Sequence, residues 1–162
     1  MMKLVRESIN FERGQDPFTS MNIGSRALIH KWFESVGLSP DRYTIDDKLN
    51  ITVGGWLDLS GTQITKLPDN LTVGGFLDLR GTQITKLPDN LTVGGSLDLR
   101  DTQITKLPDN LTVRGGSLDL SGTQITKLPD NLTVGGWLNL GGTQITSLPK
   151  SLKVKGTIYK DF

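Results

Sequence analysis

Apolar residues alternate with small or polar residues in a pattern that recurs along most of this chain. In one stretch, Leu71, Val73, Gly75, Leu77 and Leu79 occupy every second position. Because successive side chains of a β-strand point to opposite faces, a period of two predicts short strands with one apolar face. The glycine pair in the middle predicts a bend between an LTV strand and an LDL strand.

The alternating pattern belongs to a repeat of twenty residues. Residues Leu67–Lys86 read LPDNLTVGGFLDLRGTQITK, and nearly the same phrase follows as Leu87–Lys106, Leu107–Lys127 and Leu128–Ser147. An altered copy precedes them at Asp47–Lys66. A fixed period of this length is typical of a solenoid, in which each coil contacts only its neighbours. We therefore expect a mainly β fold, a parallel solenoid of about six coils.

The repeated LDL segments are expected to lie side by side in one parallel sheet. Their leucines would face the interior, together with the leucine and valine of each LTV segment. The aspartate between the two leucines would then point outward, toward solvent. These outward aspartates are Asp58, Asp78, Asp98 and Asp119.

Both ends of the array carry sequences that we expect to cap it, because the terminal leucine layers would otherwise face water. Trp32 and Phe33 belong to a run with helical spacing that Gly37 ends, and they are expected to pack over the first coil. Lysines along the last repeat would protect its edge from further pairing. The expected parts are an N-terminal segment (1–19), a helical cap (20–46), five solenoid repeats (47–147) and a C-terminal capping repeat (148–162).

The pattern LDLxGTQITKLPDNLTV resembles the leucine-rich repeat, whose general form is LxxLxLxxNxL. It is most similar to the short bacterial and bacteriophage type, which carries Leu-Pro in each unit. Leu77, Leu79, Ile84 and Leu87 match core positions of that family. Threonine, as at Thr82, stands where the family has a buried asparagine, and glycine replaces the first framework leucine. The threonine hydroxyl can still form a hydrogen bond to the backbone. A plain β-solenoid is the alternative to the leucine-rich-repeat fold.

The segment WFESVGLSPDRYTIDDKLNITVGG resembles leucine-rich repeat proteins encoded by bacteriophages and their hosts, as does the opening KLVRESINFERGQDPFTSMNIG. This resemblance implies an inhibitor or adaptor that acts on a host or competing-phage protein in the cytoplasm of the host cell. The ubiquitin-ligase members of the repeat class use a cysteine nucleophile in a separate domain. This chain contains no cysteine.

Charge and composition exclude several other classes. Lysine and arginine together number 18 against 17 acidic residues, a net charge of +1. That balance gives no general attraction for nucleic acid or an anionic membrane. The absence of cysteine removes thiolate chemistry and favours an intracellular protein, and no apolar run has the length of a signal peptide or a membrane span. We expect a soluble, cytoplasmic protein without a metal or cofactor.

The copies differ from one another mainly beside the LDL segments, on the outward side. The residue before LDL is Trp56, Phe76, Ser96, Ser117 or Trp137, and the residue after it is Ser60, Arg80, Arg100, Ser121 or Gly141. Tryptophan and arginine are over-represented among the residues that dominate protein interfaces. The candidate partner-binding residues are Trp56, Asp58, Phe76, Asp78, Arg80, Asp98, Arg100, Asp119 and Trp137.

Carboxylates stacked on neighbouring strands, about 4.8 Å apart, would repel one another. We expect Arg80 and Arg100 to offset part of this repulsion and a cationic partner surface to offset the rest. The alternative is a solvated acidic ladder that only keeps the face from aggregating. The lysine column that starts at Lys66 is matched by aspartates from Asp69 onward, and the single histidine, His30, has no metal-ligand partner. Neither is a candidate site.

The sequence therefore predicts a capped solenoid without enzymatic activity that binds a protein, through the outward face of the LDL sheet. The expected partner has a basic surface and is neither nucleic acid nor a membrane. The chain itself is expected to be a monomer or a weak homo-oligomer. The alternative is a structural or self-assembling component that stacks through the ends of its solenoid.

Overall fold

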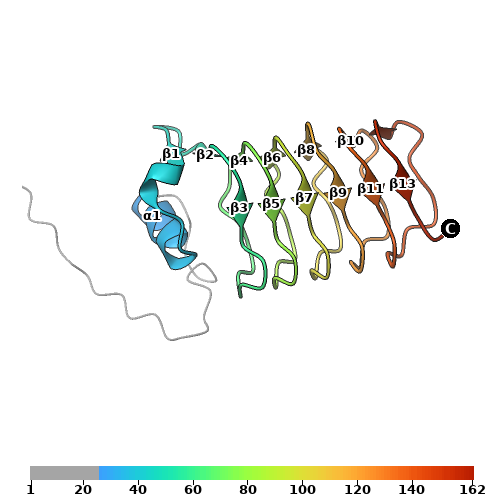
Figure 1. Ribbon diagram of the computed structural model, residues 1–162, viewed down its shortest axis with the longest axis horizontal. Coiled ribbons are helices and arrows are strands. Elements are labelled where there is room, and N and C mark those ends of the chain that lie inside the picture. The colour runs from blue at the N-terminus through green and yellow to red at the C-terminus, as the bar shows by residue number, and fades with distance from the viewer. Residues whose placement is uncertain (1–25) are drawn as a thin grey trace, which may run out of the picture.

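Two β-sheets run along the solenoid, one built from the LTV segments and one from the LDL segments (Figure 1). The structure is a computed structural model that describes residues 26–162. The LTV sheet contains, in order, β1 (Tyr43–Ile45), β2 (Ile51–Val53), β4 (Leu71–Val73), β6 (Thr92–Val93), β8 (Thr112–Val113), β10 (Thr133–Val134) and β12 (Lys153–Val154). The LDL sheet contains β3 (Leu57–Asp58), β5 (Leu77–Asp78), β7 (Leu97–Asp98), β9 (Leu118–Asp119), β11 (Leu138–Asn139) and β13 (Ile158–Tyr159).

Equivalent residues of successive coils lie side by side in both sheets. Leu57 pairs with Leu77, and Asp58 pairs with Asp78. The same in-register parallel pairing continues through β7, β9 and β11 to β13. The predicted fold class is confirmed: the protein is mainly β, with parallel strands in stacked coils and a short N-terminal helix, and it fits a leucine-rich-repeat-like solenoid.

Aliphatic side chains fill the space between the two sheets. Leu77, Leu79, Ile84, Leu87 and Leu91 are all at most 1% exposed. Leu77, Leu79 and Leu91 occupy inward positions that the alternating pattern predicted, and Ile84 and Leu87 occupy core positions that the resemblance to the leucine-rich repeat implied. Burial of each such side chain contributes roughly 1.5–3 kcal/mol to stability. The same positions of the other coils join one continuous core.

Threonine closes the turn that follows each LDL strand. The hydroxyl and the backbone N–H of Thr82 both donate to the carbonyl oxygen of Leu79, at 2.8 and 3.2 Å. Gly81 in this turn has a φ of 64°, a left-handed conformation that glycine adopts without steric cost. The equivalent threonines are Thr62, Thr102, Thr123 and Thr143. The hydroxyl therefore bonds to the backbone, as expected, and it does so within its own coil.

The glycine pairs lie where the backbones of neighbouring coils touch. The chain bends at Gly74 and Gly75, as the sequence predicted. A Cβ atom added to Gly94 would lie only 2.2 Å from the carbonyl oxygen of Gly74 in the previous coil. The extra residue of the fourth repeat, Arg114, falls at the same bend, and its N–H donates to the carbonyl of Val93 at 3.0 Å. The insertion leaves the parallel register of both sheets intact.

The helix α1 (Arg26–Ser35) packs at the amino end of the solenoid (Figure 1). Trp32 and Phe33 are 1% and 0% exposed and belong to the same apolar core as the first coil. The ring of Phe33 stacks on Tyr43 with 4.1 Å between ring centroids, and His30 Nδ1 lies 2.7 Å from the Tyr43 hydroxyl. A short 3-10 helix, η1 (Pro40–Arg42), leads into β1, which pairs antiparallel with β2. The predicted packing of Trp32 and Phe33 is confirmed.

At the opposite end, the last coil keeps the alternation in weaker form. Leu152, Val154 and Ile158 are partly buried against the core, whereas Lys153 and Lys160 are exposed. The N-terminal segment 1–19 lies outside the described residues. No helix within residues 26–162 has the length and apolar character required to cross a membrane.

Candidate functional site

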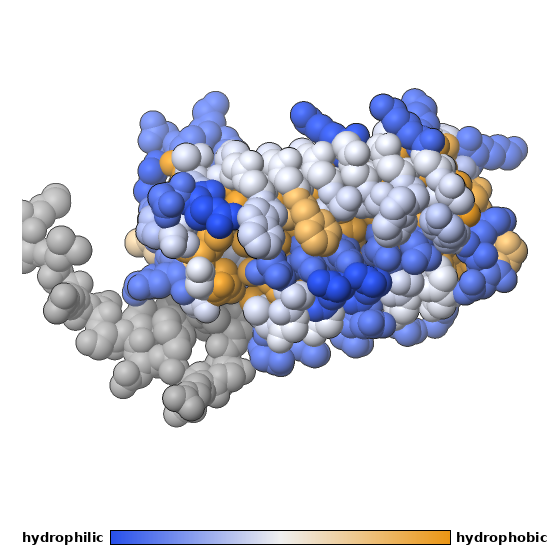
Figure 2. Space-filling model, viewed as in Figure 1, coloured by the Kyte–Doolittle hydropathy of each residue, from blue (hydrophilic) through white to orange (hydrophobic). Residues whose placement is uncertain are grey.

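The residue that precedes each LDL strand points away from the core and forms a column across the sheet. Trp56 and Trp137 are 60% and 40% exposed, Phe76 and Ser96 are partly exposed, and Ser117 is buried. We call this outward surface of the LDL sheet the LDL face. Figure 2 shows this side of the solenoid, with apolar atoms among strongly hydrophilic groups. The structure therefore places both tryptophans on the surface, where the alternating pattern predicted them.

Three of the four aspartates on the LDL face are not solvated, so the prediction of an exposed acidic ladder is wrong for them. Asp78, Asp98 and Asp119 are 2%, 7% and 7% exposed, while Asp58 is exposed. The physical reason is that each carboxylate folds back onto its own chain and is covered by neighbouring side chains.

A turn closed by the side chain explains the whole aspartate column. Asp78 Oδ1 accepts the backbone N–H of Arg80, two residues later, at 3.1 Å. Asp and Asn favour such turns because their short side chains reach this N–H. The same bond forms at Asp58, Asp98, Asp119 and Asn139. Asn139 forms the same bond through its amide oxygen. The residues of this column therefore stabilise the backbone turn, a role that does not depend on a binding partner.

Two arginines cover the buried carboxylates and link neighbouring coils. Arg80 Nη2 lies 2.5 Å from Asp78 Oδ2, and its Nε lies 3.6 Å from Asp98 Oδ2. Arg100 lies 2.6 Å from Asp98 and 3.7 Å from Asp119 in the same way. Carboxylate hydrogen bonds raise the pKa of both guanidinium groups. The arginine side chains are 46% and 41% exposed, so the accessible charge at the centre of the LDL face is positive.

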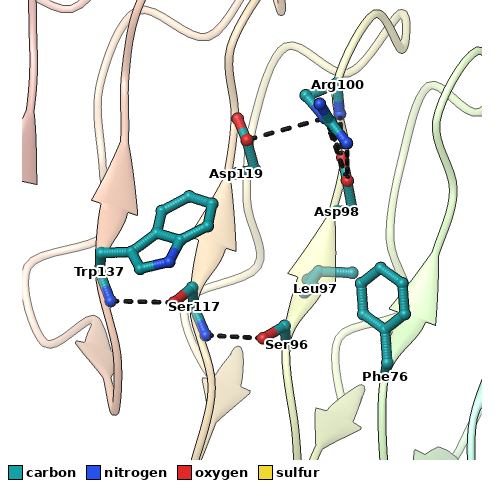
Figure 3. Close-up of a pocket in the computed structure, with 8 residues that line it drawn as sticks. All are labelled: Phe76, Ser96, Leu97, Asp98, Arg100, Ser117, Asp119 and Trp137. Carbon is teal, nitrogen blue, oxygen red and sulfur yellow. Dashed lines mark hydrogen bonds and ion pairs between the residues drawn. The ribbon is translucent and has the colours of Figure 1, made fainter.

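A groove of about 420 Å³ lies between the rings of Phe76 and Trp137 (Figure 3). The two rings stand three strands apart, about 14 Å at the usual strand spacing. The residues that line the groove between them are Ser96, Leu97, Asp98, Arg100, Ser117 and Asp119. Small serines between two aromatic rings therefore leave a hollow in an otherwise continuous column.

The serines of the groove also have a structural role that the sequence comparison missed. Ser96 Oγ accepts the backbone N–H of Ser117, and Ser117 Oγ accepts the N–H of Trp137, both at 3.0 Å (Figure 3). Each hydroxyl still has its own proton to donate to a ligand. The signal for this role was the presence of serine in two adjacent coils of one column.

At the amino end of the LDL face, Trp56 directly precedes β3 and Asp58 lies on it. Arg42 Nη2 donates to the carbonyl oxygen of Trp56 at 3.2 Å, and its guanidinium carbon lies 5.8 Å from the centroid of the indole ring. Asp58 Oδ1 accepts the hydroxyl and the N–H of Ser60 at 2.7 and 3.0 Å. These two hydrogen bonds, aided by the charge of Arg80, lower the pKa of Asp58.

The other charged features form no comparable site. Lys86 and Lys106 are exposed and lie beside Asp89 and Asp109 along a shallow strip of the surface. His30 contributes to the packing of the N-terminal cap. Among residues 26–162, no group of three or more histidine, aspartate or glutamate side chains is placed to hold a metal ion.

Comparisons with protein-family models, with curated proteins and with solved structures gave no match for this chain. The functional interpretation therefore depends on the geometry of the molecule itself. On one surface, that geometry brings together exposed tryptophans, a groove and two arginines held by buried carboxylates.

Proposed function

We propose that this protein is a non-enzymatic binding module that captures a protein partner on the LDL face. The observation that carries the proposal is where the near-identical coils differ. Their interior is repeated from coil to coil, whereas the outward column changes from tryptophan and phenylalanine to serine and back to tryptophan. Because Trp56 and Trp137 remain 60% and 40% exposed, the core does not account for their size. Exposed tryptophans are frequent anchors of protein interfaces.

The arginines of the LDL face support the same proposal. Hydrogen bonds to Asp78 and Asp98 hold Nε and Nη2 of Arg80 and Arg100. Within residues 26–162, the Nη1 atoms of these two arginines have no hydrogen-bond partner, so they are available to carbonyl groups of a bound protein. A side chain that is already fixed loses less conformational entropy when it binds. The buried carboxylates thus prepare the arginines for contact.

The resemblance to leucine-rich repeat proteins of bacteriophages extends the proposal to the role of the partner. We propose that the partner is a host or phage protein that this chain inhibits or links to another protein. The role is one of binding, and the LDL face supplies the contact residues.

Capture from a bacterial lysate tests the proposal. Immobilised wild-type protein should retain a specific protein that the Trp56→Ala/Trp137→Ala variant loses. The matched control is Thr52→Ala/Thr133→Ala, because these exposed threonines lie in the same two coils on the LTV sheet. Loss of the captured protein in the control, or its retention by the tryptophan variant, would contradict the proposal.

A further inference from the structure

The row of ion pairs on the LDL face has one position that lacks its cation. Arg80 and Arg100 each stand two residues after the aspartate of their own coil. Each arginine lies close to that aspartate and to the aspartate of the next coil. In the first coil, the residue after the LDL strand is Ser60. Asp58 and Asp78 pair in register on neighbouring strands, so these two carboxylates flank a position at which serine replaces the arginine of the next two coils.

At the opposite end of the row, the carboxylate of Asp119 is buried and contacted by other groups of the chain. Asp119 is also followed by a serine, Ser121, yet Asp119 Oδ2 lies 3.7 Å from Arg100 Nε and accepts a hydrogen bond from Asn139 at 3.4 Å. Because Asn139 stands where the other coils have aspartate, no further charge is added there. Of the four aspartates in the row, only Asp58 is both exposed and without an ion pair among the described residues.

The repeat itself shows which atoms a cation would meet at the vacant position. Asp98 Oδ2 is held by Arg100 at 2.6 Å and still approaches Arg80 of the previous coil at 3.6 Å. Asp78 is held by Arg80 in the same way, so its Oδ2 stands at the equivalent place beside the first coil. Its side chain is only 3% exposed, so Asp58 supplies the accessible carboxylate of this position. Ser60 bonds only to Oδ1 of Asp58, which leaves Oδ2 of Asp58 accessible.

We propose that this position, formed by Trp56, Asp58, Ser60 and Asp78 and here called the first-coil slot, binds an arginine or lysine side chain of the protein partner. The inference rests on the proposed function and gives the partner its chemistry. Four aspartates against two arginines leave the row with two excess negative charges. A guanidinium in the slot would repeat the forked pairing that the protein makes with Arg80 and Arg100.

The aromatic ring beside the slot favours the same ligand. Trp56 is 60% exposed, and an indole ring attracts cations through its π-face. The protein already places the guanidinium of Arg42 at 5.8 Å from this ring. The hydrogen bonds from Ser60 favour the ionised carboxylate of Asp58 and lower its pKa. A basic side chain would therefore find a carboxylate and an exposed ring together.

A titration with two small probes tests the slot directly. N-acetyl-arginine amide is the probe, and N-acetyl-citrulline amide, of nearly the same shape but uncharged, is its control. At low ionic strength, the NMR signals of the Trp56 indole N–H and the Asp58 amide should shift at least threefold more with the arginine probe than with the citrulline probe. The Asp58→Asn variant should fold, because Asn139 shows that an amide keeps the turn. In this variant, the arginine probe should cause shifts no larger than those caused by the citrulline probe. Equal shifts with both probes, or an unchanged response in Asp58→Asn, would overturn the proposal.

Filling the slot within the chain gives a second, independent readout. Ser60→Arg should raise the melting temperature by at least 2 °C more than Ser121→Arg, because only the first arginine would lie between two carboxylates. It should also abolish the response to the arginine probe. If Ser121→Arg stabilises as much as Ser60→Arg, or if the probe still binds to Ser60→Arg, the slot is not a cation site.

The outcomes also separate this inference from the proposed function. A captured protein that depends on Trp56 and Trp137, combined with no preference for the arginine probe, would overturn the slot and leave the LDL face as the binding surface. A clear preference for the arginine probe, combined with capture that ignores both tryptophans, would support the slot and contradict the proposed function.

Discussion

Nε of Arg80 lies 3.6 Å from Oδ2 of Asp98, which belongs to the next coil. The arginine thereby joins two coils of the solenoid on the surface, in addition to the backbone hydrogen bonds of the sheet. A second nitrogen of the same guanidinium, Nη2, is bound to the carboxylate of its own coil. A side chain that is nearly half exposed is therefore held in one place on the LDL face.

Arg80→Met should destabilise the protein. The change removes the cation above Asp78, whose carboxylate is only 3% exposed, and a buried charged group without its partner carries a desolvation cost. Because the side chain of Arg80 is 46% exposed, solvent screening keeps the effect modest. Urea denaturation measures it. Adding Asp78→Asn should restore most of the loss, and equal stability of Arg80→Met and wild type would contradict the account.

Trp32→Ala should destabilise the protein by about 3–5 kcal/mol, as for other buried aromatic side chains. Trp32 is 1% exposed and packs edge-on against Phe33, at 5.0 Å between ring centroids. Its removal would open the first leucine layer to water. Thermal unfolding followed by circular dichroism measures the change. A melting temperature close to that of the wild type would show that α1 does not cap the solenoid.

Trp56→Ala and Trp137→Ala should each change the free energy of unfolding by less than about 0.5 kcal/mol, as is usual for exposed positions. Leu97 directly follows Ser96 of the same outward column, but it is only 1% exposed. Leu97→Ala should therefore lower the free energy of unfolding by about 2–5 kcal/mol. Chemical denaturation of the three variants under one set of conditions gives the comparison. If either tryptophan variant is as unstable as Leu97→Ala, that tryptophan serves the fold.

The stability of the protein should fall in acid, in part through Asp58. Hydrogen bonds from Ser60 lower the pKa of Asp58 in the folded state, so the unfolded state binds protons more readily. The stabilisation is therefore present above the unfolded pKa of about 4 and is lost as pH falls through the folded pKa. Asp58→Asn keeps the turn and removes the titration. The decrease in melting temperature between pH 7 and pH 3 should be smaller in this variant than in the wild type. An identical decrease in the two proteins would exclude the contribution of Asp58.

The alternating pattern was sufficient to predict the sheets and the core, because inward and outward positions follow from a period of two. Leu77 and Leu79 are buried and Trp56 and Trp137 are exposed, as the pattern predicted. The cap was predictable for a related reason: the helical spacing around Trp32 gives a helix one apolar side, and the first coil has an open apolar end.

The sequence did not show that Asp78 is buried, because that depends on a fold-back of the side chain and on the cover of Arg80. The hydrogen bonds of Ser96 and Ser117 were also missed, since they join residues twenty or more positions apart. The close contact at Gly94 likewise arises between two coils. Contacts of this kind depend on atomic distances between stacked backbones, which residue spacing does not specify.

Hydroxyl-radical footprinting of the complex with the captured partner tests the central claim most directly, because it locates the interface on the wild-type chain without any substitution. The account predicts that Trp56 and Trp137 oxidise at least threefold more slowly in the complex than in the free protein. Phe162, which is 44% exposed at the far end of the chain, should oxidise at its free rate and serves as the internal reference. Unchanged oxidation of both tryptophans, with protection of Phe162 instead, would place the contact at the end of the solenoid and contradict the account.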